Sequence, residues 1–549
     1  MIGLALLHLT FAHQAAGMVV SDSQIASDVG AKIMRQGGNA IDAAVATGFA
    51  LTVTLPAAGN VGGGGFMVVR MADGREIAID YRETAPALAT RNMYLDKAGN
   101  PTKDSLIGYR AAGVPGTVAG FWEAHKAYGK LAWKDVVAPA VELAKNGFKL
   151  PAGLAASLKS AAKQFEAFPS SYRQFNRNGE FYLEGDLWQQ RDLGETLGRI
   201  RTDGSKGFYS GKTAQLIQAT MLANGGLLRV SDLAAYKPVL RKPLHGSFRG
   251  YEISTMPPPS SGGIAMLQML GMFEGDDLNA LGWNQPPYLH LLVESMKRAF
   301  ADRAEHLGDP GFALVPTEQL LNKSYLSDLR KTIGDRATVS RVIKAYGGRE
   351  REETTHFSVV DADGNAVANT YTLNGGYGSF ATVDGAGFLL NNEMDDFAAA
   401  PGKPNGYGLI QGEKNAIQPG KRPLSSMTPT IVTKDGKLVM VLGSPGGPTI
   451  INTVMQTILN VLVFEKTPAQ AVAAPRFHHQ WMPDEIRWER NGLPNSVRES
   501  LESKGHVFAK SGGSMGSCHL ILIDPLTGER RAGVDPRNST SGMASTSEN

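Results

Sequence analysis

Residues 354–361 read Thr-Thr-His-Phe-Ser-Val-Val-Asp, a run rich in β-branched and aromatic residues. Such a run predicts a β-strand. A second apolar run, residues 366–373, follows the turn Asp-Ala-Asp-Gly-Asn at 361–365. Two such runs around an Asp-Gly-containing turn predict a hairpin. We expect this hairpin to lie in the core, with Thr354 immediately before its first strand.

Thr354 is the candidate nucleophile. A threonine hydroxyl in mid-chain has no base of its own, but cleavage after Glu353 would give Thr354 a free α-amine that can serve as the general base. An unperturbed α-amino group titrates near pH ~8, so a useful fraction is unprotonated at neutral pH. The sequence therefore predicts an acyl-transfer site in which one cut makes both nucleophile and base.

A paired-glycine loop, Gly-Ser-Pro-Gly-Gly at 443–447, precedes a nearly continuous apolar run at 449–463 that predicts a helix. Small residues ahead of a helix expose backbone N–H groups at its positive end, where they can stabilise a developing oxyanion. Gly446 and Gly447 are the candidate donors. Taken alone, the loop could equally be a plain glycine turn before a helix.

The rest of the chain alternates between helical and strand patterns. A second hairpin surrounds Lys-Asp-Gly at 434–436, and a further strand is expected at 518–523. In the first half, helices are expected at 25–36, from Pro115, and around the apolar stripe between Leu289 and Phe300, and strands at 66–71 and 76–80. Sheets covered by helices are the simplest architecture for this pattern.

Composition indicates an ordinary soluble globular protein. The chain has 549 residues, of which 42% are hydrophobic and 19% charged, and a formal net charge of +3. No linker or low-complexity run divides it, so we expect one compact unit. Scattered Lys and Arg argue against a nucleic-acid partner. One cysteine excludes a disulfide framework within the chain and a cysteine metal site, and no metal site is predicted elsewhere.

The N-terminal residues leave two interpretations open. Residues 2–12 are apolar and Ala15-Ala16-Gly17 could pass for a cleavage site, but the basic segment of a signal peptide is missing. Residues 1–16 are therefore a signal remnant or the first element of the fold. The first interpretation predicts a periplasmic or secreted protein. No other segment is apolar over the ~20 residues of a membrane span, so no integral membrane span is expected.

Several stretches across almost the whole chain resemble the gamma-glutamyltranspeptidases, which are N-terminal nucleophile hydrolases. The stretches are Gly-Met-Val-Val-Ser at 17–21, Gly-Gly-Asn-Ala-Ile-Asp-Ala-Ala at 37–44, Gly-Asn-Val-Gly-Gly-Gly-Gly-Phe at 59–66, Asn-Asn-Glu-Met-Asp-Asp-Phe at 391–397, Arg-Pro-Leu-Ser-Ser-Met at 422–427 and Asp-Pro-Arg at 535–537. The resemblance implies an α+β fold, a four-layer αββα sandwich with two stacked antiparallel sheets between helical layers. It places Thr354 at the start of a central strand.

The same resemblance implies self-cleavage between Glu353 and Thr354. The products would be a large subunit, residues 1–353, and a small catalytic subunit, residues 354–549. Both would form one compact domain and stay associated as a heterodimer.

By resemblance, the other site residues divide by role. The hydroxyl of Thr372 would bond the new α-amine, and Arg82 with Ser425 and Ser426 would hold a substrate α-carboxylate. The substrate α-ammonium would lie among Asn374, Glu393 and Asp396. Tyr407, in a glycine- and proline-rich stretch, would close a lid over the pocket.

The activity implied is that of a self-processing gamma-glutamyltransferase and glutathione hydrolase. It would pass a gamma-glutamyl group from Thr354 to water or to an amino acid or dipeptide, without a metal or an organic cofactor. One alternative keeps the chemistry but acts on glutaryl beta-lactams or poly-gamma-glutamate. A remote alternative is a binding or scaffold protein that is never processed.

Overall fold

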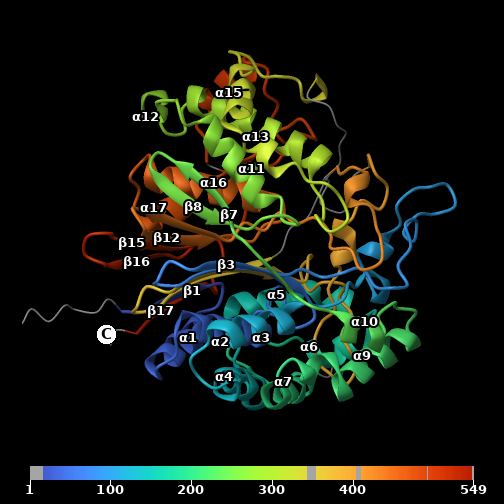
Figure 1. The fold of residues 1–549 in the computed structure, drawn as a ribbon. Helices are drawn as coiled ribbons and strands as arrows, with labels where there is room; N and C mark the ends of the chain where they lie inside the picture. The colour runs from blue at the N-terminus through green and yellow to red at the C-terminus, as the bar shows by residue number, and fades with distance from the viewer. Residues whose placement is uncertain (1–15, 178, 343–353, 404–409, 491, 547–549) are drawn as a thin grey trace, which may run out of the picture.

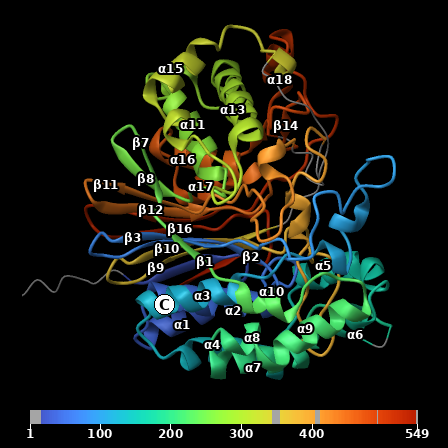
Figure 2. The ribbon, with the colours of Figure 1, turned by 45° about the vertical axis from the view of Figure 1, so that its right-hand side comes forward.

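Two antiparallel β-sheets stack face to face, and helices cover the outer face of each (Figures 1 and 2). The computed structural model describes residues 16–177, 179–342, 354–403, 410–490 and 492–546. The four layers are therefore helix, sheet, sheet and helix, which confirms the predicted α+β sandwich.

The first sheet has seven strands in the order β17-β1-β9-β10-β2-β3-β6. Their bounds are β1 Met18–Ser21, β2 Gly64–Arg70, β3 Glu76–Tyr81, β6 Val239–Arg241, β9 Thr355–Val360, β10 Ala366–Thr372 and β17 Gly542–Ser545. β9 pairs with β1 on one side and β10 on the other, so the strand after Thr354 lies inside the sheet.

The second sheet has six strands in the order β16-β15-β12-β11-β8-β7. Their bounds are β7 Leu244–Phe248, β8 Tyr251–Thr255, β11 Thr430–Lys434, β12 Lys437–Gly443, β15 His519–Ile523 and β16 Arg530–Gly533. Both sheets combine strands from before and after Thr354. Two small ribbons complete the strands, β4 Phe148–Lys149 with β5 Leu187–Trp188, and β13 Phe477–His478 with β14 Arg487–Trp488.

Helices from the first half of the chain cover the seven-stranded sheet (Figure 1). They are α1 Gln24–Arg35, α2 Ala40–Thr54, α3 Thr117–Tyr128, α4 Trp133–Asn146, α5 Ala152–Phe165, α6 Pro169–Phe175, α7 Arg191–Asp203, α8 Lys206–Tyr209, α9 Gly211–Ala223 and α10 Val230–Ala235. Every residue of α2 is buried, as expected for a helix that is apolar all round. Asn39 and Asp42 form a capping box at its start.

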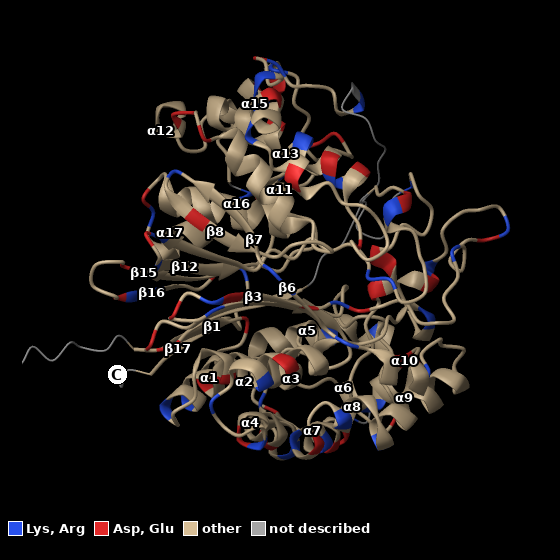
Figure 3. Cartoon of the chain, viewed as in Figure 1, with Lys and Arg blue, Asp and Glu red and all other residues tan. Residues whose placement is uncertain are grey.

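The other helical layer lies on the six-stranded sheet (Figure 1). Its helices are α11 Gly262–Met272, α12 Leu278–Leu281, α13 Pro286–His306, α14 Thr317–Leu320, α15 Lys323–Lys331, α16 Thr449–Leu462, α17 Pro468–Ala473 and α18 Asn495–Ser503. Short 3-10 turns occur at η1 Lys103–Ser105, η2 Tyr109–Ala111, η3 Ser340–Val342, η4 Glu393–Asp396 and η5 Glu413–Asn415. Basic and acidic residues are interspersed over both helical layers (Figure 3).

β9 separates two different environments. Phe357 and Val359 belong to the apolar core beneath the seven-stranded sheet. On its other face, His356 bonds Thr370 across to β10 at 2.8 Å, and Ser358 donates toward the second sheet, to the carbonyl of His519 at 3.2 Å. The face of β9 toward the second sheet is therefore polar at His356 and Ser358, whereas Val360 belongs to the apolar core between the sheets.

The predicted elements are present with small shifts at their ends. Both hairpins, the helix after the glycine loop and the strand near 518–523 are confirmed as β9–β10, β11–β12, α16 and β15. The helix expected from Pro115 begins at Thr117 instead. No described helix has the length and apolar character that crossing a membrane would require.

Candidate active site around Thr354

Thr354 lies immediately before β9 and lines a cavity. Its side chain is 9% exposed, and it lines a space of about 590 Å³ together with Pro445, Gly446 and Gly516. β9 holds the following residue, Thr355, in register with Tyr371 of β10. Continuing that register places Thr372 opposite Thr354. The two threonines that the resemblance singles out are thus brought together by strand pairing.

The glycine loop enters the same cavity. Gly446 has φ +127° and Gly447 φ +51°, backbone conformations that residues with side chains rarely adopt. A Cβ on Gly446 would lie 2.6 Å from Oγ1 of Thr449, whose hydroxyl donates to the Gly446 carbonyl at 2.6 Å. α16 begins at Thr449, so the loop stands at the positive end of a helix as predicted.

Thr372 and Asn374 form a tight local structure at the end of β10. The Asn374 backbone N–H donates to Oγ1 of Thr372 at 2.8 Å, and Asn374 itself has φ +78°. Its Nδ2 donates to the carbonyl of Asn392 at 3.0 Å. This bond ties the end of β10 to the turn that carries Glu393.

Arg82 lies at the exit of β3 and is fully enclosed, with 1% exposure. Its Nη1 is 2.5 Å from Oε1 of Glu393, and its Nη2 pairs with Asp396. The guanidinium also donates to the carbonyls of Pro423 and Leu424, each at 3.3 Å. The cation and both carboxylates predicted for substrate recognition are therefore in direct contact.

The two serines lie just beyond that contact. Ser425 follows Leu424, and its Oγ accepts from the N–H of Met427 at 3.1 Å. Oγ of Ser426 accepts from Nη2 of Arg303 at 3.3 Å. The structure therefore places both hydroxyls on the segment that binds Arg82 through its carbonyls. Glu353 and Tyr407, the predicted cleavage and lid residues, lie outside the described residues.

Asp22 is a site residue that sequence analysis does not single out. It follows β1 and lines the Thr354 cavity, and Oγ1 of Thr355 donates to it at 2.8 Å. Oγ of Ser517 and Nδ2 of Asn538 each donate to Oδ1 of Asp22 at 2.9 Å, and Nε2 of His519 lies 2.9 Å from the same oxygen. Burial opposes ionisation, but His519 and these donors lower the pKa of Asp22 to about 2. A buried carboxylate thus fixes the residue next to Thr354.

Glu83 lies behind Arg82 and is also buried. Burial raises the pKa of Glu83 to about 7, and burial likewise raises that of Glu393 well above its usual range, against the opposing effect of Arg82. One arginine therefore faces more carboxyl groups than it can neutralise.

A Glu83→Gln substitution should remove a pH-dependent loss of stability. A carboxyl whose pKa is raised on folding contributes stability that is present below its unfolded value and lost as pH rises through the folded one. For Glu83 the window runs from 4.5 to about 7. Relative to wild type, the variant should gain on the order of 3 kcal/mol between pH 4.5 and pH 8. Urea unfolding at several pH values measures this. The exposed Glu166→Gln is the control, and parallel pH profiles of wild type and Glu83→Gln would contradict the expectation.

Comparison with known proteins gives one consistent result. A family model described as gamma-glutamyltranspeptidase matches residues 26–545. The chain is 47% identical over 533 residues to the glutathione hydrolase proenzyme of Escherichia coli (strain K12), covering 95% of this chain and 90% of that protein.

Solved structures agree. A cephalosporin acylase from Bacillus halodurans has a TM-score of 0.84 at 27% identity, covering 96% of both chains. The gamma-glutamyltranspeptidase of Helicobacter pylori has a TM-score of 0.58 at 45% identity, covering 63% of this chain and 97% of that one. These matches confirm the resemblance found in the sequence. The chain belongs to the gamma-glutamyltranspeptidase family.

Proposed function

We propose that this protein is a self-processing gamma-glutamyltransferase and glutathione hydrolase. The observation that carries the proposal is the direct contact of Arg82 with Glu393 and Asp396, in a fold where Thr354 and Gly446 share a cavity. A glutamyl end carries both an α-carboxylate and an α-ammonium. A buried site with one cation and two carboxylates offers a partner for each charge.

Maturation frees the α-amine of Thr354. Oγ of Thr354 attacks the carbonyl carbon of Glu353, the peptide shifts from nitrogen to oxygen, and water cleaves the resulting ester. The products are residues 1–353, ending in a carboxylate, and residues 354–549, beginning with the α-amine of Thr354. They stay associated as a heterodimer, because each sheet contains strands from both parts.

In the mature enzyme, Thr354 acts as nucleophile and base. Its α-amine accepts the hydroxyl proton as Oγ attacks the gamma-carbonyl, and that proton passes to the departing amine. Thr372 orients the α-amine, and the N–H groups of Gly446 and Gly447 stabilise the oxyanion. Losing one such donor typically costs about 2.7 to 4 kcal/mol. The gamma-glutamyl ester is then resolved by water or by an amino acid or dipeptide.

Donor recognition follows from the charged cluster. Arg82, with the hydroxyls of Ser425 and Ser426, holds the α-carboxylate of the donor. Glu393 and Asp396, with the side chain of Asn374, surround its α-ammonium. By the family resemblance, Tyr407 is assigned as the lid residue.

Two measurements test this function together. On a denaturing gel, purified protein should show two bands rather than one of 58.6 kDa. It should release free glutamate from glutathione much faster than glutarate from a glutaryl amide, because a glutaryl group has no ammonium to pair with Glu393 and Asp396. A single band, without release of glutamate, would point to the unprocessed binding protein.

Faster release of glutarate would favour the acylase alternative. One comparison supports that alternative: a relative 37% identical to this chain is named Acylase ACY 1 proenzyme.

A further inference from the structure

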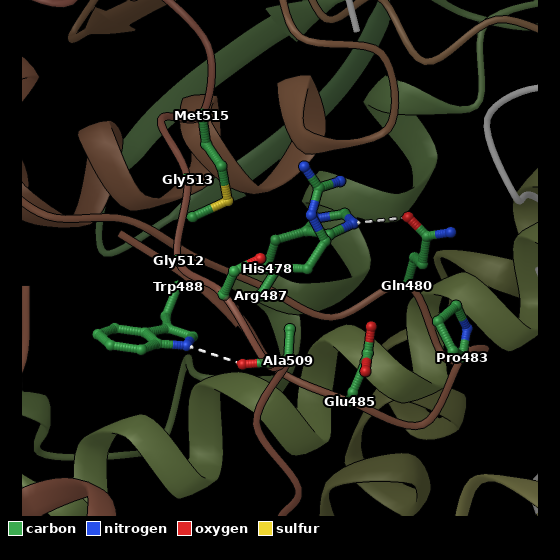
Figure 4. A pocket seen from close by; sticks show the side chains of 11 residues that line it. His478, Gln480, Pro483, Glu485, Arg487, Trp488, Ala509, Gly512, Gly513 and Met515 are labelled. Carbon is green, nitrogen blue, oxygen red and sulfur yellow. Dashed lines mark hydrogen bonds between the residues drawn. The ribbon is translucent and has the colours of Figure 1, made fainter. Parts of the chain in front are cut away.

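A second cavity adjoins the one that Thr354 lines. It has a volume of about 250 Å³ and lies beside the β13–β14 ribbon (Figure 4). Arg487 lines both cavities. The segment at 511–517 forms the wall between them, because Gly512, Gly513 and Met515 line the second cavity while Ser514, Gly516 and Ser517 line the first. The two spaces are therefore neighbours that share one cation.

The second cavity is lined by side chains of both charges. Glu485 and Arg487 both line it, and they are two positions apart in the chain. His478 is the cross-strand partner of Arg487, and Figure 4 shows the two side chains together. Burial, followed by the adjacent guanidinium, lowers the pKa of His478 well below its usual range. Arg487 is therefore the cation at this end of the cavity.

The donor residues lie elsewhere. Among the described residues, the linings of these two cavities do not include Arg82, Glu393 or Asp396. Thr354 thus lines a cavity that has its own arginine, Arg487, apart from the arginine of the donor cluster.

We propose that the cavity at Arg487 binds the amine acceptor of acyl transfer, an amino acid or dipeptide whose carboxylate pairs with Arg487. This inference rests on the proposed function of Thr354. Because Arg487 lines both cavities, a dipeptide bound there by its carboxylate, which spans at most about 7 Å, can extend its amine into the cavity that Thr354 lines. The acceptor nitrogen bonds to the acyl carbon, the bond from that carbon to Oγ breaks, and the amine proton returns to Oγ through the α-amine.

A carboxylate-deletion experiment tests the pairing. The probes are glycylglycine and glycylglycine amide, which differ only in the carboxylate, with glutathione as donor. The measured quantity is the ratio of transfer product to free glutamate within each sample, which cancels differences in donor turnover. Wild type should prefer glycylglycine by about tenfold or more, as expected for a charge-assisted pair.

Three variants sharpen the result. Arg487→Gln should abolish the preference for the carboxylate, Arg487→Lys should keep part of it, and Glu485→Gln should retain it. Arg531→Gln, at an exposed arginine of β16, is the matched control and should behave as wild type.

The possible failures are distinct. A full preference in Arg487→Gln would overturn the inference, as would equal use of both probes by wild type. If Arg487→Gln does not mature, the wild-type and Arg487→Lys ratios still decide. Absence of free glutamate in wild type would instead contradict the proposed function itself.

Discussion

A Thr354→Ala variant should remain a single chain and release no glutamate from glutathione. Without Oγ, no ester forms at Glu353, so the α-amine that would serve as base never appears. Both losses follow from one atom, and activity should fall by at least about 10⁴-fold. A denaturing gel, the intact mass and a glutamate assay measure the outcome.

Thr354→Ser is the conservative control for this experiment. It retains a hydroxyl and should mature and turn over glutathione, although its rates will differ because the side chain lacks the methyl group. A Thr354→Ala protein that is cleaved and active would end the assignment of Thr354 as nucleophile.

An Arg82→Gln variant should lose both donor recognition and stability. Removing one partner of a buried charge pair typically costs about 3 to 5 kcal/mol, because the remaining charges stay uncompensated. Here Glu393 and Asp396 would both lose their cation. We expect kcat/KM for glutathione to fall about 100- to 1,000-fold and the thermal midpoint to drop. Steady-state kinetics and calorimetry measure the two effects.

Two further variants separate charge from general damage. Arg91→Gln removes a surface ion pair with Glu413, whose side chain is 75% exposed, and should cost at most about 1 kcal/mol. Adding Glu393→Gln to Arg82→Gln removes one of the stranded carboxylates and should restore part of the stability but not the activity. If Arg82→Gln melts like Arg91→Gln, the buried cluster is not the source of the stability.

Local signals account for most of the elements that the sequence predicts. The Asp-Gly turns at 361–365 and 434–436 predict two hairpins. The glycines before Thr449 predict the start of a helix. These features depend on residues a few positions apart, where turn chemistry and periodicity act. The order of strands is different in kind. β1 pairs with both β9 and β17, which lie hundreds of residues away, and no local pattern specifies such partners.

The site shows the same division. Arg82, Glu393 and Asp396 are named from the sequence by resemblance, but their mutual contact depends on how β3 and η4 meet in space. The sequence alone does not identify Asp22 as a site residue, because a lone carboxylate after a short strand is usually a surface charge. Only the packing of β1 against β9 reveals that it accepts hydrogen bonds from Thr355 and Ser517. The close approach of Gly63 to the Thr372 carbonyl, 2.0 Å for a hypothetical Cβ, likewise explains a glycine run that carries no recognisable motif.

The presence in each sheet of strands from both sides of Thr354 has a thermodynamic consequence. β9 is hydrogen-bonded on one edge to β1, which precedes the cut, and on the other to β10, which follows it. Neither polypeptide could keep a complete sheet if its companion diffused away, and separation would expose hydrophobic surface equivalent to unfolding. The proposed cleavage would therefore leave two chains that do not separate, and dilution should not inactivate the cleaved enzyme.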